Sequence, residues 1–212
     1  VLDNKENVIK LAKGEIDLWI INDLTGRHMA RGEGLSDHIK KVFEVQKDYM
    51  YIAFSKTTPD EVVRKWQNVL DEIKSDGSYG QIFANWVMFS YSDDLKPKIT
   101  KALSLSEEEK AWTKAHPVIR VAPDPDYAPF QYTDLNGNSQ GLANDYLILI
   151  EKKLGIRFDM VPTESWNKSL ESVKAHSADM VVVAAKTASR EKYLSFTSPY
   201  VVFPDVIITR KN

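Results

Sequence analysis

The sequence contains 212 residues, of which 43% are apolar and 27% are charged, the balance of a soluble globular protein. The 28 Lys and Arg residues against 30 Asp and Glu give a formal net charge of -2, so a nucleic-acid binder is not expected. The absence of cysteine excludes disulfides, thiol catalysis and cysteine-ligated zinc. No apolar run reaches the ~18 to 20 residues that a membrane-spanning helix requires.

The first part of the chain predicts a mixture of helices and short buried strands. Its clearest helix begins with a capping box, in which Thr58 caps, Pro59 takes the first helical position and Glu61 completes the box. Three glycines and several charges between residues 22 and 34 predict a loop. The elements expected here are helices over 3–13, 58–76 and 79–86 and buried strands over 16–21 and 49–54.

The second part follows a polar stretch over 90–104, which predicts a linker, and a short helix that Pro117 ends. From there strands alternate with helices of ~10 to 15 residues, which is typical of βαβ units with a parallel sheet. The sequence therefore predicts an α/β fold. The expected strands are 118–122, 156–161, 180–185 and 205–210, and the expected helices are 142–154 and 165–175.

The patterns of the common catalytic and metal sites are missing from the sequence. The four histidines, at positions 28, 38, 116 and 176, have no spacing that puts two on one helix face, so a histidine-ligated metal is not expected. The sequence contains no Gly-x-Ser-x-Gly, no phosphate-binding glycine loop and no dinucleotide fingerprint. We therefore expect neither an enzyme nor a cofactor.

Two clusters that directly follow predicted strands indicate a binding site. The first is Asp124–Phe130, in which two prolines hold Tyr127 as a stiff aromatic platform. Ligands of open α/β sheets bind just beyond the carboxyl ends of the strands. The alternative interpretation is a proline-rich turn that anchors an aromatic side chain.

The second cluster is Ala184–Arg190, which follows the strand over 180–185. An arginine at the start of a helix near a strand end can bind a carboxylate through two parallel hydrogen bonds. The alternative is a solvated helix start that Thr187 or Ser189 caps. Both clusters at strand ends of one sheet predict a cleft for a small ligand.

At these clusters the sequence resembles the family 3 extracellular solute-binding proteins. Residues 119–130 are similar to the opening strand and loop of that family. The same order of motifs continues through Gly141, Leu154-Gly155-Ile156, Trp166, Ala178-Asp179, Thr187-x-x-Arg190 and Phe196–Tyr200. The resemblance implies a type II periplasmic-binding-protein fold, in which two α/β lobes joined by hinge strands close on a solute.

The first part of the chain resembles the opposite end of the same family. Residues 11–23 are similar to a helix and strand of the second lobe, and residues 51–86 to the closing strand and final helices. Residues 105–117 resemble the connector between tandem solute-binding domains in sensor histidine kinases of the virulence-sensor kind. The domains expected are the C-terminal part of one solute-binding domain over 1–92, a linker with a short helix over 93–116, and the N-terminal lobe of the next domain over 117–212.

This order of halves leaves three interpretations open. The chain is a fragment that spans the end of one domain and the start of the next, which is the most economical interpretation. A circular permutant is the second, although the start of the second lobe is missing. In the third, two chains complete each other as a homodimer that exchanges halves.

The resemblance also assigns site residues. Arg190 matches the arginine that binds the ligand carboxylate, Tyr127 and Phe130 match an aromatic wall, and Asp124 matches a polar contact. Asn22 or Asp23 falls where the family places the acidic partner of a ligand amine. The full set of expected ligand-binding residues is Asn22, Asp23, Asp124, Tyr127, Phe130, Trp166, Ala185, Lys186, Thr187 and Arg190.

Two departures bear on the ligand. Ala185 stands where amino-acid binders usually have a Ser or Thr hydroxyl, and Asn22 replaces the usual Asp unless Asp23 serves. A carboxylate-bearing solute is therefore expected, and a plain α-amino acid less so.

The function that the resemblance implies is periplasmic sensing of such a solute, without catalysis, for a membrane-bound signalling protein. The first alternative is a substrate-binding protein of an ABC transporter for amino acids. The second is a dehydratase of the same fold, which would need an acid/base carboxylate beside Arg190; Glu164 and Glu191 are the nearest in sequence.

Overall fold

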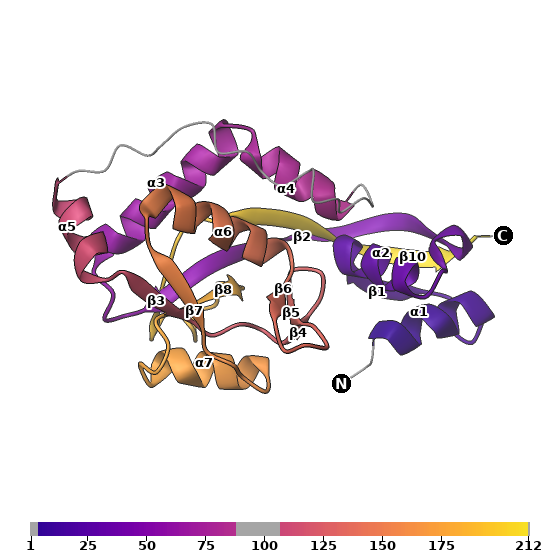
Figure 1. Ribbon diagram of the computed structural model, residues 1–212. Helices are drawn as coiled ribbons and strands as arrows, with labels where there is room; N and C mark the ends of the chain where they lie inside the picture. The colour runs from indigo at the N-terminus through magenta and orange to yellow at the C-terminus, as the bar shows by residue number, and fades with distance from the viewer. Residues whose placement is uncertain (1–3, 88–106, 212) are drawn as a thin grey trace. The chain divides into compact units, whose positions relative to one another are not determined.

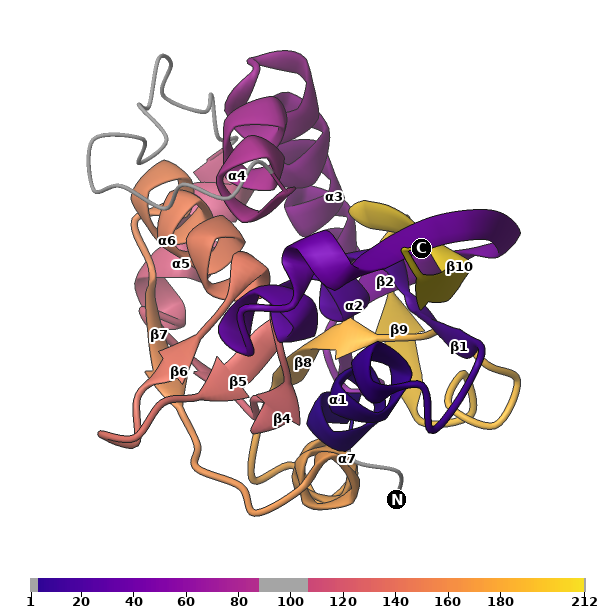
Figure 2. The same cartoon turned by 90° about the vertical axis from the view of Figure 1, so that its right-hand side faces the viewer.

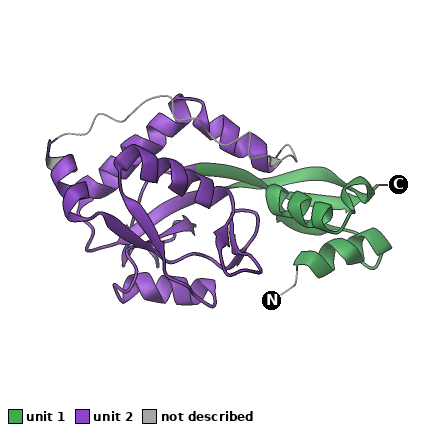
Figure 3. Ribbon diagram, viewed as in Figure 1, with its two compact units in different colours: residues 1–49, 201–212 green, residues 50–200 purple. Residues whose placement is uncertain are grey.

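The computed structural model describes residues 4–87 and 107–211 (Figure 1). The chain forms two compact units: unit 1 comprises residues 1–49 and 201–212, and unit 2 comprises residues 50–200 (Figure 3). Most of the expected linker lies outside the described residues, and the sequence-based division at residues 92 and 116 remains a prediction. No helix in the described ranges is long and apolar enough to cross a membrane.

Three parallel strands form the centre of unit 2. β3 (Val118–Val121) pairs in parallel with β7 (Arg157–Met160) along its length and with β8 (Met180–Ala184) at its carboxyl end. Every residue of β8 is buried, which explains its uninterrupted apolar sequence. The prediction of an α/β fold with parallel strands is confirmed.

The long strand β2 (Ile39–Ser55) joins this sheet from the first part of the chain. It runs antiparallel to β8, with Phe54 opposite Met180, and antiparallel to β9 (Leu194–Phe196), with Phe54 opposite Ser195. Only its second half is apolar and buried, from Met50 onward, and this half contains the predicted strand. The first half mixes charged and apolar residues, most of them exposed, so the sequence pattern did not show that the strand starts at Ile39.

The helices of unit 2 are α3 (Asp60–Ser75), α4 (Ser78–Val87), α5 (Glu107–Ala115), α6 (Leu142–Leu154) and α7 (Trp166–Lys174). Helices α3, α4 and α6 pack on one another on one side of the sheet, and α7 lies on the other side (Figure 1). Gly155 ends α6 in the left-handed conformation at φ 65°, as predicted. The predicted capping box of α3 is wrong, because Pro59 occupies the N-cap and no side chain caps the helix.

A buried ammonium group joins α6 to the end of α3. The Lys153 side chain is 0% exposed, and its Nζ lies 3.1 Å from a Glu72 oxygen and 3.0 Å from an Asp76 oxygen. Burial alone would lower the pKa of Lys153, but the two carboxylates outweigh it and hold this pKa above its usual value. The cluster connects segments more than 70 residues apart.

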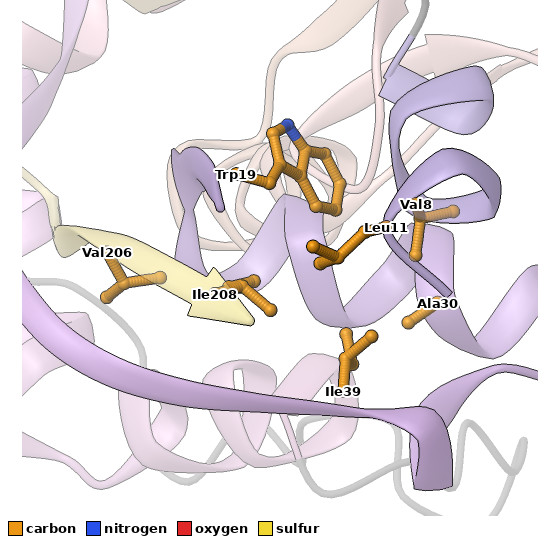
Figure 4. Packing of buried hydrophobic residues seen from close by; sticks show 7 residues of the cluster. All are labelled: Val8, Leu11, Trp19, Ala30, Ile39, Val206 and Ile208. Atoms are coloured by element: carbon orange, nitrogen blue, oxygen red, sulfur yellow. The ribbon is translucent and has the colours of Figure 1, made fainter. Parts of the chain in front are cut away.

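Unit 1 packs two helices on one face of a small antiparallel sheet. Its elements are α1 (Asn4–Lys13), β1 (Trp19–Asn22), α2 (Asp23–Gly32), a short 3-10 helix (Ser36–His38), the first half of β2, and β10 (Val201–Arg210). β1 pairs with β10 in register, with Trp19 opposite Ile208. The core contains Val8, Leu11, Trp19, Ala30, Ile39, Val206 and Ile208 (Figure 4).

The prediction of a loop over 22–34 is wrong, because these residues form α2. The Asn22 side-chain oxygen accepts hydrogen bonds from the backbone N–H groups of Leu24 and Thr25 and so caps the helix. Its glycines lower intrinsic helix propensity, which is why the sequence pattern favoured a loop. One of them, Gly26, is needed where the helix approaches the sheet: an added Cβ would lie 2.7 Å from Ile208 Cδ1.

Lys153→Met tests the buried ion cluster. We expect the free energy of unfolding to fall by about 3 kcal/mol, because two carboxylates would be left without the buried ammonium. Urea denaturation followed by circular dichroism measures the loss. Lys152→Met, at the exposed neighbouring position, should change stability by less than about 0.5 kcal/mol. Equal midpoints for the two variants would contradict the assigned role of Lys153.

Candidate functional site

The candidate site of unit 2 lies at the carboxyl ends of its three parallel strands. Because β7, β3 and β8 run in the same direction, the segments that follow them leave from the same edge of the sheet. These segments contain eight of the ten predicted site residues. The residues are Asp124, Tyr127 and Phe130 after β3, Trp166 after β7, and Ala185, Lys186, Thr187 and Arg190 after β8.

Hydrogen bonds join the segment after β3 to the segment after β7. The carbonyl oxygen of Pro123 accepts from Thr163 Oγ1 at 2.9 Å and from Ser169 Oγ at 2.6 Å. Ser169 is fully buried and belongs to α7. The first turn of α7 is therefore held against the loop that carries Asp124, and this places Trp166, the first residue of α7, beside the same edge.

Arg190 joins the segment after β8 to that helix. Its guanidinium carbon lies 5.4 Å from the centre of the Trp166 ring, and its Nη1 donates a hydrogen bond to the Ala185 carbonyl at 2.9 Å. The side chain is partly exposed. Two independent contacts therefore orient the guanidinium at a place that solvent reaches.

The segment around Arg190 is a turn, and the predicted helix start is wrong. Residues 188–193 form turns, and the backbone N–H of Arg190 lies 3.0 Å from the Thr187 carbonyl oxygen and 3.3 Å from Thr187 Oγ1. Thr187 thus caps a turn in the manner predicted for a helix. Lys186 forms an exposed ion pair with Glu191 at 3.1 Å.

Asp124 is the buried carboxylate of the site, with 9% of its surface exposed. Burial raises its pKa; the hydrogen bond that its Oδ1 accepts from the Asp126 N–H opposes this, and the charge of Asp126 adds to it. A buried carboxyl group with a raised pKa at the end of a strand is typical of functional sites.

Tyr127 and Phe130 form a ring pair with centroids 4.9 Å apart and planes inclined at 42°. Tyr127 is partly exposed, whereas Phe130 is completely buried. Phe130 therefore supports the Tyr127 ring from the interior, and Tyr127 is the one of the pair whose surface is open.

Gln131 is a site residue that the sequence analysis missed. It lies in a small sheet of β4 (Asp126–Tyr127), β5 (Gln131–Thr133) and β6 (Ser139–Gln140), which Figure 2 shows beside β8. Its fully buried side chain accepts from the Asp124 N–H at 3.0 Å and donates to Asn144 Oδ1 at 3.2 Å. The turn sequence Asp134–Gly137 between two short strands was the signal for this hairpin.

Asn22 and Asp23 belong to unit 1, whereas the other eight residues belong to unit 2. The Asn22 oxygen is engaged in capping α2, while its buried Nδ2 has no hydrogen-bond partner among the described residues. Asp23 forms an ion pair with Arg27 at 3.0 Å. Among the residues described, no three His, Asp or Glu side chains are grouped so that they could hold a metal ion.

Residues 119–212 match the model of the bacterial extracellular solute-binding proteins, family 3. The matched part lies in the second half of the chain. It contains β3, β7, β8 and the loops described above, and the match confirms the resemblance drawn from the sequence. With the α/β architecture of unit 2, it also confirms the predicted fold class of a type II solute-binding lobe.

Two sensor proteins are similar to the chain. It is 27% identical over 205 residues to the sensor protein EvgS of Escherichia coli (strain K12), which covers 95% of the chain and 16% of that protein. It is 30% identical over 107 residues to the virulence sensor protein BvgS of Bordetella bronchiseptica, over 50% of the chain and 9% of that protein. The chain thus spans a small fraction of the length of these curated relatives.

Several solved structures are similar to parts of the chain. The arginine-bound form of domain 1 from TmArgBP is 22% identical at a TM-score of 0.38, over 51% of this chain and 87% of that one. An ancestral cationic amino acid solute-binding protein, AncCDT-1, is 28% identical at a TM-score of 0.35, over 39% and 36%.

Gly141→Ala tests how the loop that carries Tyr127 is held. Gly141 has φ 119°, and an added Cβ would lie 2.5 Å from the Phe130 carbonyl oxygen. We expect a loss of at least about 2 kcal/mol in the free energy of unfolding, measured in urea. Gly80→Ala, in α4 with nothing within 4 Å of the added Cβ, should be neutral or stabilising. Equal effects of the two substitutions would contradict this assignment.

Asp124→Asn tests the cost of the buried carboxylate. Because the folded pKa of Asp124 is raised, its ionisation lowers stability above that pKa, and this cost is absent below the unfolded pKa. The variant should therefore unfold at higher urea concentration than the parent near about pH 7, with no difference near about pH 3. Asp159→Asn, at an exposed position, should show no such pH-dependent gain. A gain that is the same at both pH values would contradict the prediction.

Proposed function

We propose that this chain is a non-catalytic, extracytoplasmic module that binds a small carboxylate-bearing solute at the carboxyl edge of the unit 2 sheet. The matched family is a solute-binding family whose description names its members extracellular, which supports this location. The similar sensor proteins support a role as the sensing part of a membrane-bound signalling protein. The match to EvgS covers 95% of the chain and so includes both of its parts, which favours the sensor over a transporter-associated binding protein.

The orientation of Arg190 is the observation that carries this proposal. Within the described ranges, its Nη1 group is hydrogen-bonded to Ala185 and its face lies against Trp166. Its remaining guanidinium N–H groups donate to no acceptor among the described residues, and the side chain is partly exposed. A guanidinium fixed in this way can donate two parallel hydrogen bonds to a carboxylate without losing much side-chain entropy.

The other residues of the edge add selectivity. We assign the open face of Tyr127 to contact with the apolar part of the solute, with Phe130 as its buried support. Asp124 supplies a carboxylate that a cationic group of the solute would pair with and whose pKa it would lower again. A solute with both a carboxylate and a cationic group fits this pair of charges.

The arrangement of possible acid/base groups supports binding over catalysis. Of the two candidate carboxylates, Glu191 is paired with Lys186, and Glu164 is exposed. Neither lies in the water-excluded setting that a general acid or base of a dehydratase would need. We therefore propose that a dehydratase activity is absent.

We further propose that residues 1–92 derive from the end of one solute-binding domain and residues 117–212 from the start of the next. Pairing of β2 with β8 within a single chain supports completion of the sheet inside one molecule over an exchange of halves. The helix contacts of α3 with α6 support the same arrangement.

Arg190→Ala tests the proposed binding role. A thermal-shift screen of the common amino acids, 2-oxo acids and polyamines identifies a ligand, and calorimetric titration then gives its affinity. We expect Arg190→Ala to weaken binding of a carboxylate ligand at least about 100-fold and Arg190→Lys to weaken it less, because lysine lacks the planar fork.

Lys192→Ala, at the exposed position two residues away, is the matched control and should keep the parent affinity. Unchanged affinity in Arg190→Ala would remove Arg190 from the site. Binding of polyamines alone would overturn the carboxylate assignment.

A further inference from the structure

The first half of β2 exposes apolar side chains that the solute-binding proposal does not use. Val42 is 50% exposed, Phe43 62%, Val45 47% and Tyr49 45%. They are interspersed with charged residues along an extended strand of unit 1. An exposed apolar strand with unpaired backbone groups is a template for pairing with another chain.

One edge of this strand is occupied by β10. Within unit 1 the His38 carbonyl accepts from the Lys211 N–H at 2.8 Å, and within unit 2 the Met50 carbonyl accepts from the Tyr200 N–H at 2.9 Å. One edge of β2 is therefore occupied by β10 between residues 38 and 50.

The opposite edge of β2 is covered over only part of its length. Beyond residue 50 this edge is covered, since Tyr51 pairs with Ala184 and Ala53 with Val181 of β8. Over residues 39–49 no strand in the described part of the chain pairs with it. This stretch of β2 therefore has an open strand edge.

The charges of this strand are self-complementary in one antiparallel register. Two copies related by a twofold axis through Val42 place Lys40 of each copy opposite Glu44 of the other. The same register places Val42 of one copy opposite Val42 of the other, so that two exposed apolar side chains also meet. Lys40 and Glu44 are exposed, and the only recorded ion pair of Glu44 among the described residues is a surface contact with Lys41 at 4.0 Å, which costs little to give up.

Neighbouring registers are less favourable. A twofold axis at Lys41 or at Glu44 places like charges directly opposite each other, which is destabilising. An axis at Phe43 leaves Lys40 and Glu44 without opposite charges. In the register about Val42, every residue lies opposite one that directs its backbone groups to the same edge, as antiparallel pairing requires.

We propose that two copies of this chain associate by antiparallel pairing of β2 over residues 39–45, centred on Val42, so that the sheet of unit 1 continues from one copy into the next. Such a contact is isologous, with the same segment on both sides. It uses only unit 1 residues and none of the residues at the carboxyl edge of unit 2. Backbone hydrogen bonds supply affinity, and the Lys40–Glu44 pairs select the register.

Sedimentation equilibrium of the chain over a range of concentrations tests this interface. We expect a reversible dimer. Glu44→Lys or Lys40→Glu alone places two like-charge pairs in the interface and should weaken dimerisation at least about tenfold. The double variant Lys40→Glu with Glu44→Lys restores opposite charges in exchanged positions and should recover the dimer.

Val45→Pro is a backbone test, because proline removes an N–H group from the strand that would pair. It should weaken the dimer while circular dichroism shows a retained fold. Lys152→Glu, an exposed charge reversal in α6, is the control and should leave the dimer unchanged.

Three results would overturn the proposal. The first is a monomer at every concentration, and the second is a dimer that Glu44→Lys and Val45→Pro leave intact. The third is a chain that stays monomeric alone and binds a different protein through this edge.

Discussion

Backbone pairing between β2 and β8 is the interaction on which the rest of unit 2 depends. It places a strand from the first part of the chain beside the central strands of the second part, with Phe54 opposite Met180. Once β2 is in place, α3 follows it directly and packs on α6, which brings Glu72 and Asp76 to the buried Lys153. The ion cluster is thus a consequence of strand pairing, and its burial makes it specific for that arrangement.

The binding edge has its geometry because the strands beneath it are parallel. Three strand ends at one edge bring together segments that are up to about 60 residues apart in sequence, and side chains then connect them. The Pro123 carbonyl oxygen accepts hydrogen bonds from hydroxyl groups of the segment after β7 and of α7. Arg190 lies against Trp166 at the start of α7. The sheet fixes the positions of the loops at its edge, and the side chains of these loops are the groups that could contact a ligand.

One strand serves two different environments. The second half of β2 is apolar and lies inside the unit 2 sheet, whereas the first half mixes charged and apolar residues and has an open edge. The lysines of this half discourage pairing with an unrelated strand. In the proposed dimer one of them instead meets Glu44 of the second copy. The same charges would thus act against wrong partners and in favour of the right one.

Local patterns in the sequence determined most element types and the chemistry of the site. Apolar runs marked β3, β7 and β8, Gly155 marked the end of α6, and Arg190 and Asp124 were identified as polar groups at strand ends. These features depend on neighbouring residues, which a sequence displays directly. The family resemblance was likewise visible, because its motifs occur in order along one stretch of chain.

Tertiary structure alone decided the features that depend on distant residues. The pairing of β2 with β8 has no local signal in the sequence. Helix α2 forms despite its glycines because Asn22 caps it and because Gly26, which has no side chain, lets the helix approach Ile208 of the sheet closely. The burial of Phe130 and the support that Gln131 gives to Asp124 also depend on packing across the fold. The sequence determined which groups are present at the edge, and tertiary contacts decided how they are oriented, because orientation depends on residues far away in the chain.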